Sequence, residues 1–355
     1  MVGGMSASHR AFSPRDPAPM GEVSQACEVV AFLRDPSIYP GRPGELSVRE
    51  TRTSWVFLTP RHVFKLKKRI VDEFVDFRSA EARRRNAIDE VRLNRRLAPD
   101  VYLGVVPVTR ADGVLRLGGE GEAVDWLVEM RRLNQAEFLD EWALGGSLPS
   151  DRIEILADRL AAFYRAAPRA PISAGENVAR FRHEILSARQ GLSDPRFGLS
   201  EGRVRRIAGA QLRFLMGPAD PIGRPAAMGR IVEGHGDLRP EHVWLGSDPV
   251  VIDCLEFNAD LRRLDPFDEL SYLSLECERL GAPHVGRLLI ARVAARLKHC
   301  PPPALLAFYR SVRAFMRARF ALRHLLEPAP REPAKWPHLA RAYLAIAEAS
   351  ALQLP

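Results

Sequence analysis

The chain has 355 residues, of which 46% are hydrophobic and 27% charged, and its formal net charge is +8. These values are typical of a globular protein with an ample core, and no apolar run approaches the roughly 20 residues of a membrane span. The arginines that supply the charge are scattered among acidic residues in helical segments, which favours a solvated surface over a nucleic acid interface.

The N-terminal segment and the cysteines indicate the compartment. Residues 1–22 contain Pro, Ser, Gly and Ala without the apolar stretch of a signal peptide, so we expect a disordered tail. The four cysteines, Cys27, Cys254, Cys277 and Cys300, show neither metal-binding spacing nor a disulfide framework. We therefore expect a cytoplasmic protein with no membrane partner.

Residues 23–130 are predicted to form a small α+β lobe. Helical periodicity predicts a short helix at 23–34 and a strong helix at 79–97. Strand-like apolar runs lie at 46–48, 55–58, 63–66, 104–109, 114–117 and 124–130. From these runs we expect an antiparallel sheet of five strands, with the 79–97 helix inserted after the third strand.

Residues 131–355 are predicted to form a larger, mainly helical lobe. Helices are expected at 153–166, 178–191, 204–215, 268–280, 285–297, 303–325 and 338–352. A small sheet lobe followed by a larger helical lobe is a bilobal architecture.

A hairpin pattern interrupts these helices between residues 234 and 265. Two short apolar strands are joined at Gly246–Pro249, with acidic residues at their outer ends. If the hairpin closes symmetrically about this turn, His242 lies opposite Asp253, and Asp237 sits in the loop that leads in. Two acids and an imidazole would then converge on a volume that holds a metal and a phosphate, which is how kinases arrange phosphoryl transfer.

Lysine usage points to the same chemistry. Only five lysines occur among the 52 basic residues, and three of them are Lys65, Lys67 and Lys68. A lysine is a compact point charge suited to meeting a phosphate oxygen, although lysines also protect exposed strand edges from aggregation. On the 79–97 helix, Glu90 shares an apolar face with Leu93 and therefore needs a partner, for which Lys65 is the candidate; an ordinary solvated glutamate is the other interpretation.

With these residues placed, the chain resembles the aminoglycoside phosphotransferase-like enzymes of the protein-kinase-like fold. The matching stretches occur in the expected order over roughly residues 25–325. They are Ser54–Thr59, Val63–Lys68, Glu90–Pro99, Tyr102–Pro107, Val128–Leu133, His235–Leu238 and Ile252–Asn258. The His-Gly-Asp segment alone would be a weak match, whereas the ordered set is specific.

The resemblance implies roles for the acidic residues and for a phosphate lysine. Asp237 is expected to orient or deprotonate an acceptor hydroxyl, and Asp253 to hold the Mg²⁺ ion that bridges the ATP phosphates. Lys65, held by Glu90, is expected to meet the α- and β-phosphates. Lys67 lies on the same strand face and competes for this role.

The resemblance also implies roles for residues of the adenine site and of the catalytic loop. Val63 favours Lys65 as the phosphate lysine, because an apolar side chain two residues earlier then lines the adenine pocket. Backbone groups near Glu129 and Met130 are expected to hydrogen-bond adenine. His235 is expected to be a structural residue of the loop and not a base.

Two departures from the family pattern concern the phosphates and the metal. His242 stands where the family has an asparagine; Mg²⁺ prefers oxygen ligands, whereas Mn²⁺ accepts imidazole readily. His242 is therefore expected to ligate a softer metal, to hydrogen-bond Asp253 or the phosphates, or to be a packed loop histidine. The turn at Arg52–Ser54 has no glycine, so hydroxyls of Thr51, Thr53 and Ser54 are candidates to contact the phosphates.

The leading hypothesis is an ATP-dependent phosphotransferase that acts on a hydroxyl of a small molecule. A nucleotide-binding pseudokinase is the second hypothesis. A transition-metal hydrolase that uses His235, Asp237, His242 and Asp253 is the third. The residues identify neither the acceptor nor the oligomeric state, because specificity does not follow from the fold.

Overall fold

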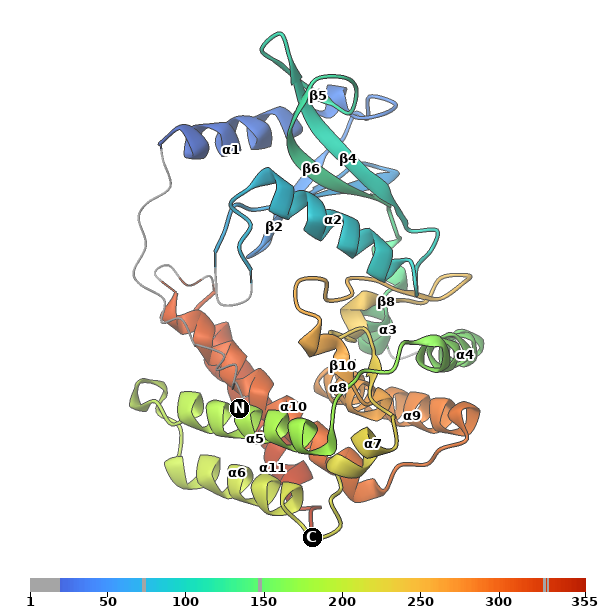
Figure 1. The fold of residues 1–355 in the computed structure, drawn as a ribbon, viewed down its shortest axis with the longest axis vertical. Helices are drawn as coiled ribbons and strands as arrows, with labels where there is room; N and C mark the ends of the chain where they lie inside the picture. The colour runs from blue at the N-terminus through green and yellow to red at the C-terminus, as the bar shows by residue number, and fades with distance from the viewer. Residues whose placement is uncertain (1–19, 72–74, 146–148, 328–329, 331) are drawn as a thin grey trace, which may run out of the picture.

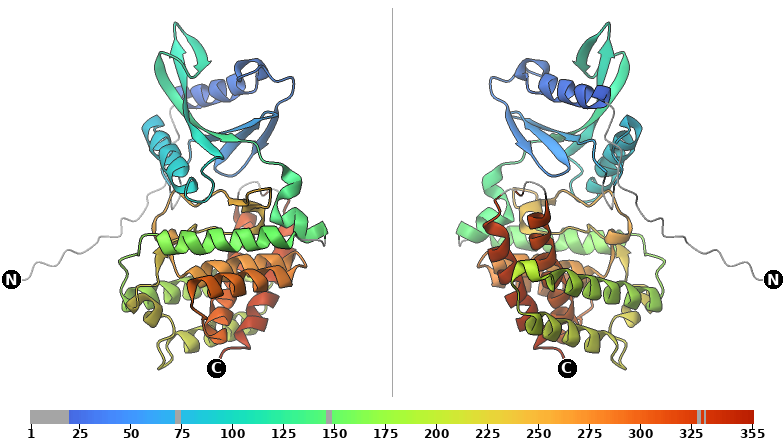
Figure 2. Two further views of the ribbon diagram at one scale, coloured as in Figure 1. Left: turned by 90° about the vertical axis from the view of Figure 1, so that its right-hand side faces the viewer. Right: turned by 90° about the vertical axis from the view of Figure 1, so that its left-hand side faces the viewer.

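The computed structural model describes residues 20–71, 75–145, 149–327, 330 and 332–355, with side chains from residue 27 onward. A small lobe contains an antiparallel sheet and two helices, and a larger lobe below it is mainly helical (Figures 1 and 2). This arrangement confirms the bilobal α+β fold. Of the tail expected at 1–22, residues 1–19 lie outside the described residues. Residues 20–22 belong to the first helix, which begins at Met20.

The sheet of the small lobe has six strands, one more than expected. They are β1 (Ser47–Glu50), β2 (Ser54–Leu58), β3 (His62–Lys67), β4 (Tyr102–Ala111), β5 (Val114–Leu117) and β6 (Glu122–Arg131). Their order is β1-β2-β3-β6-β4-β5, and all neighbours are antiparallel. The extra strand arises because each of the six apolar runs finds a partner, including the edge strand β1.

Two helices pack on the sheet through two different apolar clusters. Helix α1 (Met20–Leu33) contributes Val29 and Leu33 to a cluster that includes Leu127 of β6. Helix α2 (Ala80–Asn94) contributes Ala87 to a second cluster that includes Val128, the next residue of β6. Successive strand residues point to opposite sheet faces, so the two helices lie on opposite sides of β6. In Figures 1 and 2, α2 is the one nearer the helical lobe.

The helical lobe contains all seven expected helices. They are α4 (Ser150–Ala166), α5 (Ala174–Leu192), α6 (Glu201–Leu215), α8 (Pro266–Arg279), α9 (Pro283–Leu297), α10 (Pro303–Arg323) and α11 (Lys335–Ala351). Two short helices, α3 (Leu139–Gly145) and α7 (Gly223–Ala227), were not expected, because five to seven residues are too few to show helical periodicity. None of the helices in the described ranges is long and apolar enough to cross a membrane.

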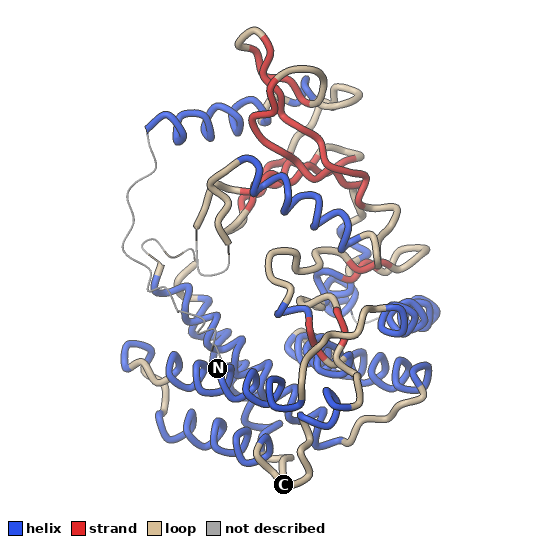
Figure 3. Tube along the Cα trace, viewed as in Figure 1, coloured by secondary structure: helices blue, strands red, loops and turns tan. Residues whose placement is uncertain are grey.

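Short strand pairs lie between the sheet and the helices (Figure 3). Strands β8 (Val243–Trp244) and β9 (Val250–Val251) form the expected hairpin, and β7 (Val232–Glu233) pairs with β10 (Arg263–Leu264).

The register of the hairpin differs from symmetric closure by one residue. Val243 pairs with Val251, so His242 lies opposite Ile252, whose N–H donates to the His242 carbonyl at 2.9 Å. The expectation that His242 lies opposite Asp253 is therefore wrong. The strand pairing does not extend to Leu245, whose N–H instead donates to the Glu137 carbonyl at 2.7 Å.

One buried ion pair joins α2 to the sheet. Arg83 donates from Nε and Nη2 to the two carboxylate oxygens of Asp125 at 2.7 and 2.8 Å, and both side chains are buried. Arg83 Nη1 also donates to the Phe77 and Arg78 carbonyls. The guanidinium therefore fixes the start of α2 against β6.

We expect Arg83→Ala to lower the free energy of unfolding by about 3–5 kcal/mol, because it removes both short hydrogen bonds from Arg83 to the buried Asp125 carboxylate and leaves it with the more distant Arg69 guanidinium at 3.9 Å. Urea denaturation would measure this loss. Arg92→Ala is the matched control, since Arg92 is exposed and pairs with Asp89 on the helix surface; it should change stability by less than about 0.5 kcal/mol. Equal effects of the two substitutions would contradict a structural role for the buried pair.

Candidate active site

A hollow of about 150 Å³ lies between the sheet lobe and the hairpin. It receives side chains from the turn before β2, from β3 and from the segments that flank the hairpin. The residues that line it are Arg52, Thr53, Lys65, Lys67, Val75, Phe77, Asp237, Asp253, Leu255, Glu256 and Phe257. Basic and acidic side chains from both lobes thus meet at one place.

Glu90 is a buried carboxylate shared by two lysines. Lys65 and Lys67 lie on the same face of β3, and their Nζ atoms are 2.8 Å from Glu90 Oε1 and 2.7 Å from Glu90 Oε2. Burial acts to raise the pKa of Glu90, but the charges of Lys65 and Lys67 outweigh it and hold that pKa below its usual range. Glu90 is therefore ionised.

The two lysines differ in their second partner. Lys65 Nζ also contacts Asp253 Oδ1 at 2.8 Å, whereas Lys67 Nζ contacts Glu256 Oε1 at 2.6 Å. The Lys65 side chain is 15% exposed and that of Lys67 only 3%. Lys65 is thus the lysine that contacts Asp253. Glu256 was not predicted, although it stands three residues after Asp253 in a motif that the sequence singles out.

Asp253 adopts a backbone conformation that is uncommon for a residue with a side chain. Its φ is +61°, in the left-handed region that aspartate tolerates better than most residues. Its N–H donates to the Tyr102 hydroxyl at 3.0 Å, and the next N–H, of Cys254, donates to Asn94 Oδ1 at 2.8 Å. Desolvation acts to raise the pKa of Asp253, but the charges of Lys65 and His242 hold it well below its usual range.

The loop before Asp237 is anchored by a buried glutamate of α8. Glu269 accepts from the His235 and Gly236 N–H groups at 3.0 and 2.5 Å and from the Tyr164 hydroxyl at 2.8 Å. Gly236 has φ +90°, and a Cβ there would lie 3.1 Å from Leu255 Cβ, so the turn requires glycine. Glu269 was not predicted, because nothing in its helical pattern distinguishes it from other α8 residues.

His235 is neutral and its two ring nitrogens are both occupied. Nε2 donates to the Ile252 carbonyl at 2.9 Å, and Nδ1 accepts from the Asp237 N–H at 3.3 Å. Burial, together with the charge of His242, lowers the pKa of His235 to about 3. These bonds link the loop to β9 and leave His235 no free nitrogen for a metal.

Asp237 projects into the hollow and is held from the helical lobe. Arg239 Nη2 lies 3.0 Å from Oδ2, and the Tyr272 hydroxyl of α8 donates to Oδ1 at 3.3 Å. Burial acts to raise the pKa of Asp237, but the charges of Arg239, His242 and Arg317 hold it below its usual range. Asp237 is therefore an ionised acceptor at the boundary of the two lobes.

His242 lies between the two aspartates. Nδ1 donates to the Asp237 carbonyl at 2.8 Å, while Nε2 is 3.5 Å from Asp253 Oδ2 and 3.2 Å from Arg239 Nη2. A Mg²⁺ ion needs only one or two protein ligands when phosphate oxygens complete its shell, so Asp253 fits it, with His242 Nε2 within reach as a second donor.

The described residues contain no group of three or more His, Cys, Asp or Glu side chains arranged to hold a metal ion. The third hypothesis requires such a cluster, and His235, one of its members, has both ring nitrogens engaged. Among the described residues, the transition-metal hydrolase hypothesis therefore lacks the ligand cluster that it requires.

Glu129 and Met130 lie near the end of β6, one strand away from Lys65. In the ladder with β3, Met130 pairs with Val63 and Glu129 with Phe64. Val63 packs against the apolar cluster that contains Met130, together with Leu133 and Ile252. This apolar surface lies beside Lys65, where the resemblance places an adenine pocket.

The same cluster contains Trp244 of β8, which was not predicted. Its indole is buried and Nε1 donates to the Asn134 carbonyl at 3.2 Å, just after β6 ends. A Cβ on Gly246 would lie 1.9 Å from this ring, so glycine is required beside it.

The glycine-free turn presents one of the three predicted hydroxyl residues to the hollow. Thr51 Oγ1 accepts from the Ser54 N–H at 2.9 Å, and Ser54 is fully buried. Thr53 lines the hollow. The turn is therefore closed by side-chain bonds of its own, and Thr53 is the one of the three hydroxyl residues that lines the hollow.

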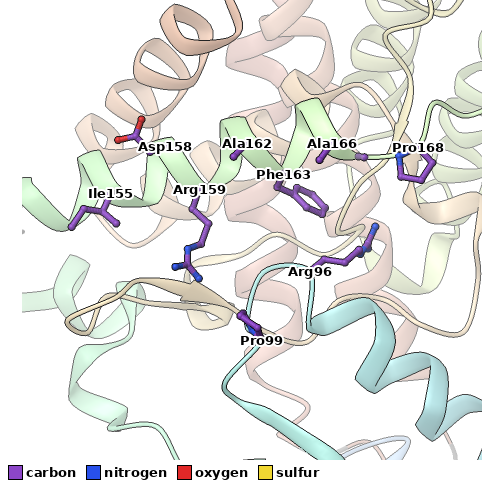
Figure 4. A pocket seen from close by; sticks show the side chains of 10 residues that line it. Arg96, Pro99, Ile155, Asp158, Arg159, Ala162, Phe163, Ala166 and Pro168 are labelled. Carbon is purple, nitrogen blue, oxygen red and sulfur yellow. The ribbon is translucent and has the colours of Figure 1, made fainter.

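A wider hollow of about 780 Å³ lies apart from these residues, between α4 and the segment after α2 (Figure 4). Its charged groups serve the fold: Arg159 pairs with Asp248 at 2.6 Å, and Arg96 donates to the Glu233 and Gly234 carbonyls. None of the predicted site residues lines it.

Comparison with known proteins shows relatives of this chain and a shared fold. No family model matches the chain. Uncharacterized proteins of Mycobacterium bovis and Mycobacterium tuberculosis are 34% identical to it over 279 residues, which is 77% of this chain and 54% of theirs. The chain thus spans about half the length of the curated relatives it matches.

Two solved structures cover 92% of this chain, each with a TM-score of 0.54. One is a choline/ethanolamine kinase family protein from Mesorhizobium loti at 15% identity, of which 94% is covered. The other is a choline kinase from Cryptosporidium parvum at 8% identity, of which 96% is covered. The fold expected from the resemblance is confirmed.

We expect protonation of His235 to destabilise the protein as the pH falls. Its folded pKa of about 3 lies below the unfolded value near 6.5, so the unfolded chain binds the proton first. Stability present above pH 6.5 is then lost toward pH 3, by up to about 1.4 kcal/mol per pH unit. Urea denaturation between pH 7 and 4 should show a flatter dependence for His235→Asn than for the wild type.

The matched control for this pH dependence is His284→Asn, at an exposed position of α9. It should keep the wild-type slope. Parallel curves for His235→Asn and the wild type would contradict a buried, neutral His235.

Proposed function

We propose that this chain, which has the protein-kinase-like fold of the choline kinases and the aminoglycoside phosphotransferase-like enzymes, is an ATP-dependent phosphotransferase that acts on a hydroxyl of a small molecule. The observation that carries the proposal is the contact of Lys65 Nζ with both Glu90 and Asp253. It joins the sheet lobe to the segment after the hairpin and lies in the same hollow as Asp237. The choline kinases with this fold are themselves small-molecule kinases.

Lys65 is the proposed ligand of the α- and β-phosphates. Glu90 is buried and also binds Lys67, so it holds Lys65 in one position without approaching the phosphates itself. The direct Lys65–Asp253 ion pair would open when phosphates enter between the two side chains. Backbone groups near Glu129 and Met130, beside Val63, are the proposed adenine contacts.

Asp237 is the proposed base. The acceptor oxygen forms a bond to the γ-phosphorus as the bond from that phosphorus to the ADP oxygen breaks, and the hydroxyl proton passes to an Asp237 carboxylate oxygen. The Tyr272 hydroxyl fixes one of these oxygens and Arg239 the other. The ionised state of Asp237 leaves it able to accept a proton.

Asp253, with His242 as a second donor, is the proposed ligand of the divalent ion that accompanies ATP. That ion would neutralise phosphate charge. Arg239, whose Nη2 lies 3.2 Å from His242 Nε2, supplies further positive charge at the same place.

A pseudokinase is the second candidate, and the hydrogen bonds of His242 favour it. Nδ1 is committed to the Asp237 carbonyl, and Nε2 lies close to the Arg239 guanidinium as well as to Asp253. A second metal ligand with these partners would weaken the metal site and leave nucleotide binding without turnover.

We expect calorimetry to detect ATP binding that depends on Mg²⁺ or Mn²⁺. Asp253→Ala should weaken it at least tenfold, because it removes the metal ligand. Asp237→Asn should keep ATP binding but slow ADP formation by about 10²–10⁴-fold, since it removes the base. The exposed Asp151→Asn is the control and should match the wild type.

Absence of ATP binding with either metal would overturn the phosphotransferase and pseudokinase proposals together. Binding without ADP formation for any hydroxyl compound would favour the pseudokinase.

His242→Asn should shift metal preference from Mn²⁺ toward Mg²⁺, because it replaces an imidazole nitrogen with an amide oxygen. The measurement is the ratio of ATP dissociation constants with the two metals, which we expect to change at least threefold. His324→Asn, at a histidine stacked on Trp336, should leave the ratio unchanged. An unchanged ratio in His242→Asn would assign His242 to packing alone.

A further inference from the structure

On the side of the helical lobe, Asp237 is contacted by a tyrosine that lies between two arginines. Tyr272 donates to Asp237 Oδ1, and the guanidinium carbons of Arg313 and Arg317 lie 5.8 and 5.9 Å from the centre of its ring. The two arginines are four residues apart on α10 and therefore share one face of that helix. The charge of Arg317 acts on Asp237 directly, since it helps to lower the pKa of that carboxylate.

The carboxylates of this face lie beneath the arginines. Asp268 and Glu276 stand one turn before and one turn after Tyr272 on α8, and each side chain is only 1% exposed. Asp268 accepts from Arg313 at 2.8 and 2.6 Å. The negative charges of Asp268 and Glu276 are therefore not accessible to solvent.

Glu276 is neutralised by several donors at once. It accepts from Arg279 at 2.7 Å, from Arg317 at 3.2 Å and from the Tyr343 hydroxyl at 2.6 Å. The more exposed Glu241, in the catalytic loop, is paired with Arg239 Nη1 at 2.6 Å. Asp268, Glu276 and Glu241 therefore each have a basic partner.

Arg313 and Arg317 are partly accessible to solvent, whereas their partners Asp268 and Glu276 are not. The Arg317 side chain is 26% exposed and that of Arg313 19%. Arg317 bonds through Nε and Nη2, and its Nη1 makes no hydrogen bond to any residue that the structure describes. A molecule that approaches Asp237 from the helical lobe thus meets guanidinium groups, one of which has a donor to offer.

The surface beside Asp237 would bind an anionic acceptor more favourably than a cationic one. An ammonium group needs carboxylates or an open aromatic face, but Asp268 and Glu276 are buried, Glu241 is paired with Arg239, and the Tyr272 ring is flanked by guanidinium groups. A carboxylate or phosphate would gain charge-assisted hydrogen bonds from Arg317. The net charge of +8 would also attract an anion at long range.

We infer that the acceptor carries an anionic group, a carboxylate or a phosphate, near the hydroxyl that is phosphorylated, and that Arg317 binds this group. The inference rests on the proposed phosphotransferase function. It names the charge of the substrate, which neither the fold nor the predicted site residues determine.

The test measures ADP formation from ATP with hydroxyl compounds matched except in charge. The three-carbon set is glycerol, glycerate, glycerol 3-phosphate and 3-amino-1,2-propanediol; the six-carbon set is glucose, gluconate, glucose 6-phosphate and glucosamine, with choline as a further cation. We expect an anionic member to exceed its neutral and cationic counterparts at least tenfold in kcat/KM. The carboxylate and phosphate arms distinguish the two sources of negative charge.

Arg317→Gln should raise the KM for the preferred anion at least tenfold, with a smaller change in kcat and none in ATP affinity. Arg203→Gln is the control, because Arg203 is similarly exposed and pairs with Glu348, away from Asp237; it should behave as the wild type. Where Arg317→Gln does not fold, Arg317→Lys, which keeps a positive charge over Glu276, should still raise this KM at least threefold.

Preference for an amine, choline or a neutral compound would overturn the inference. So would ADP formation at the background rate with every anion while ATP still binds, or an unchanged KM in the Arg317 variants. Loss of ATP binding by the wild type is a separate outcome, since it overturns the proposed function on which the inference rests.

Discussion

The buried carboxylate of Glu90, shared by two lysines, is the interaction on which the candidate site depends. A charge without exposure to water is tolerated only with close partners of opposite charge, because its desolvation is costly. Lys65 and Lys67 each form an ion pair with one oxygen of Glu90. This requirement fixes which face of α2 meets β3, and it directs Lys65 toward Asp253 and Lys67 toward Glu256.

The C-terminal end of α2 extends this control to the catalytic loop. Asn94 holds the Cys254 N–H, directly after Asp253, and Arg96 donates to the Glu233 and Gly234 carbonyls, just before His235. Both aspartates of the site are thus flanked by backbone that α2 and the residues directly after it hold. A shift of α2 would displace Lys65 and the two loops together, so one element couples the two lobes.

Charge is arranged differently on the two sides of Asp237. Toward the sheet lobe, lysines and acids alternate in a chain from Glu256 through Lys67, Glu90 and Lys65 to Asp253. Toward the helical lobe, acids are buried and arginines cover them. The first side suits phosphates that arrive with a divalent ion, and the second suits an acceptor that brings its own negative charge. This division follows from burial and not from composition, since both sides contain acids and bases in similar numbers.

The sequence by itself determined the two lobes, the seven longer helices, the runs that became strands, and the concentration of Lys65, Glu90, Asp237 and Asp253 in motifs. These features depend on local periods of two and 3.6 residues and on residue types that phosphate chemistry requires. The one-residue shift of the hairpin is visible only in the tertiary structure, where Leu245 bonds to the distant Glu137 and not across the hairpin. The tertiary structure likewise decided between Lys65 and Lys67 as the neighbour of Asp253, and it brought Tyr272 and Arg317 to Asp237. Such contacts join residues far apart in the chain, and no local pattern encodes which of several similar side chains will be buried and which will face the site.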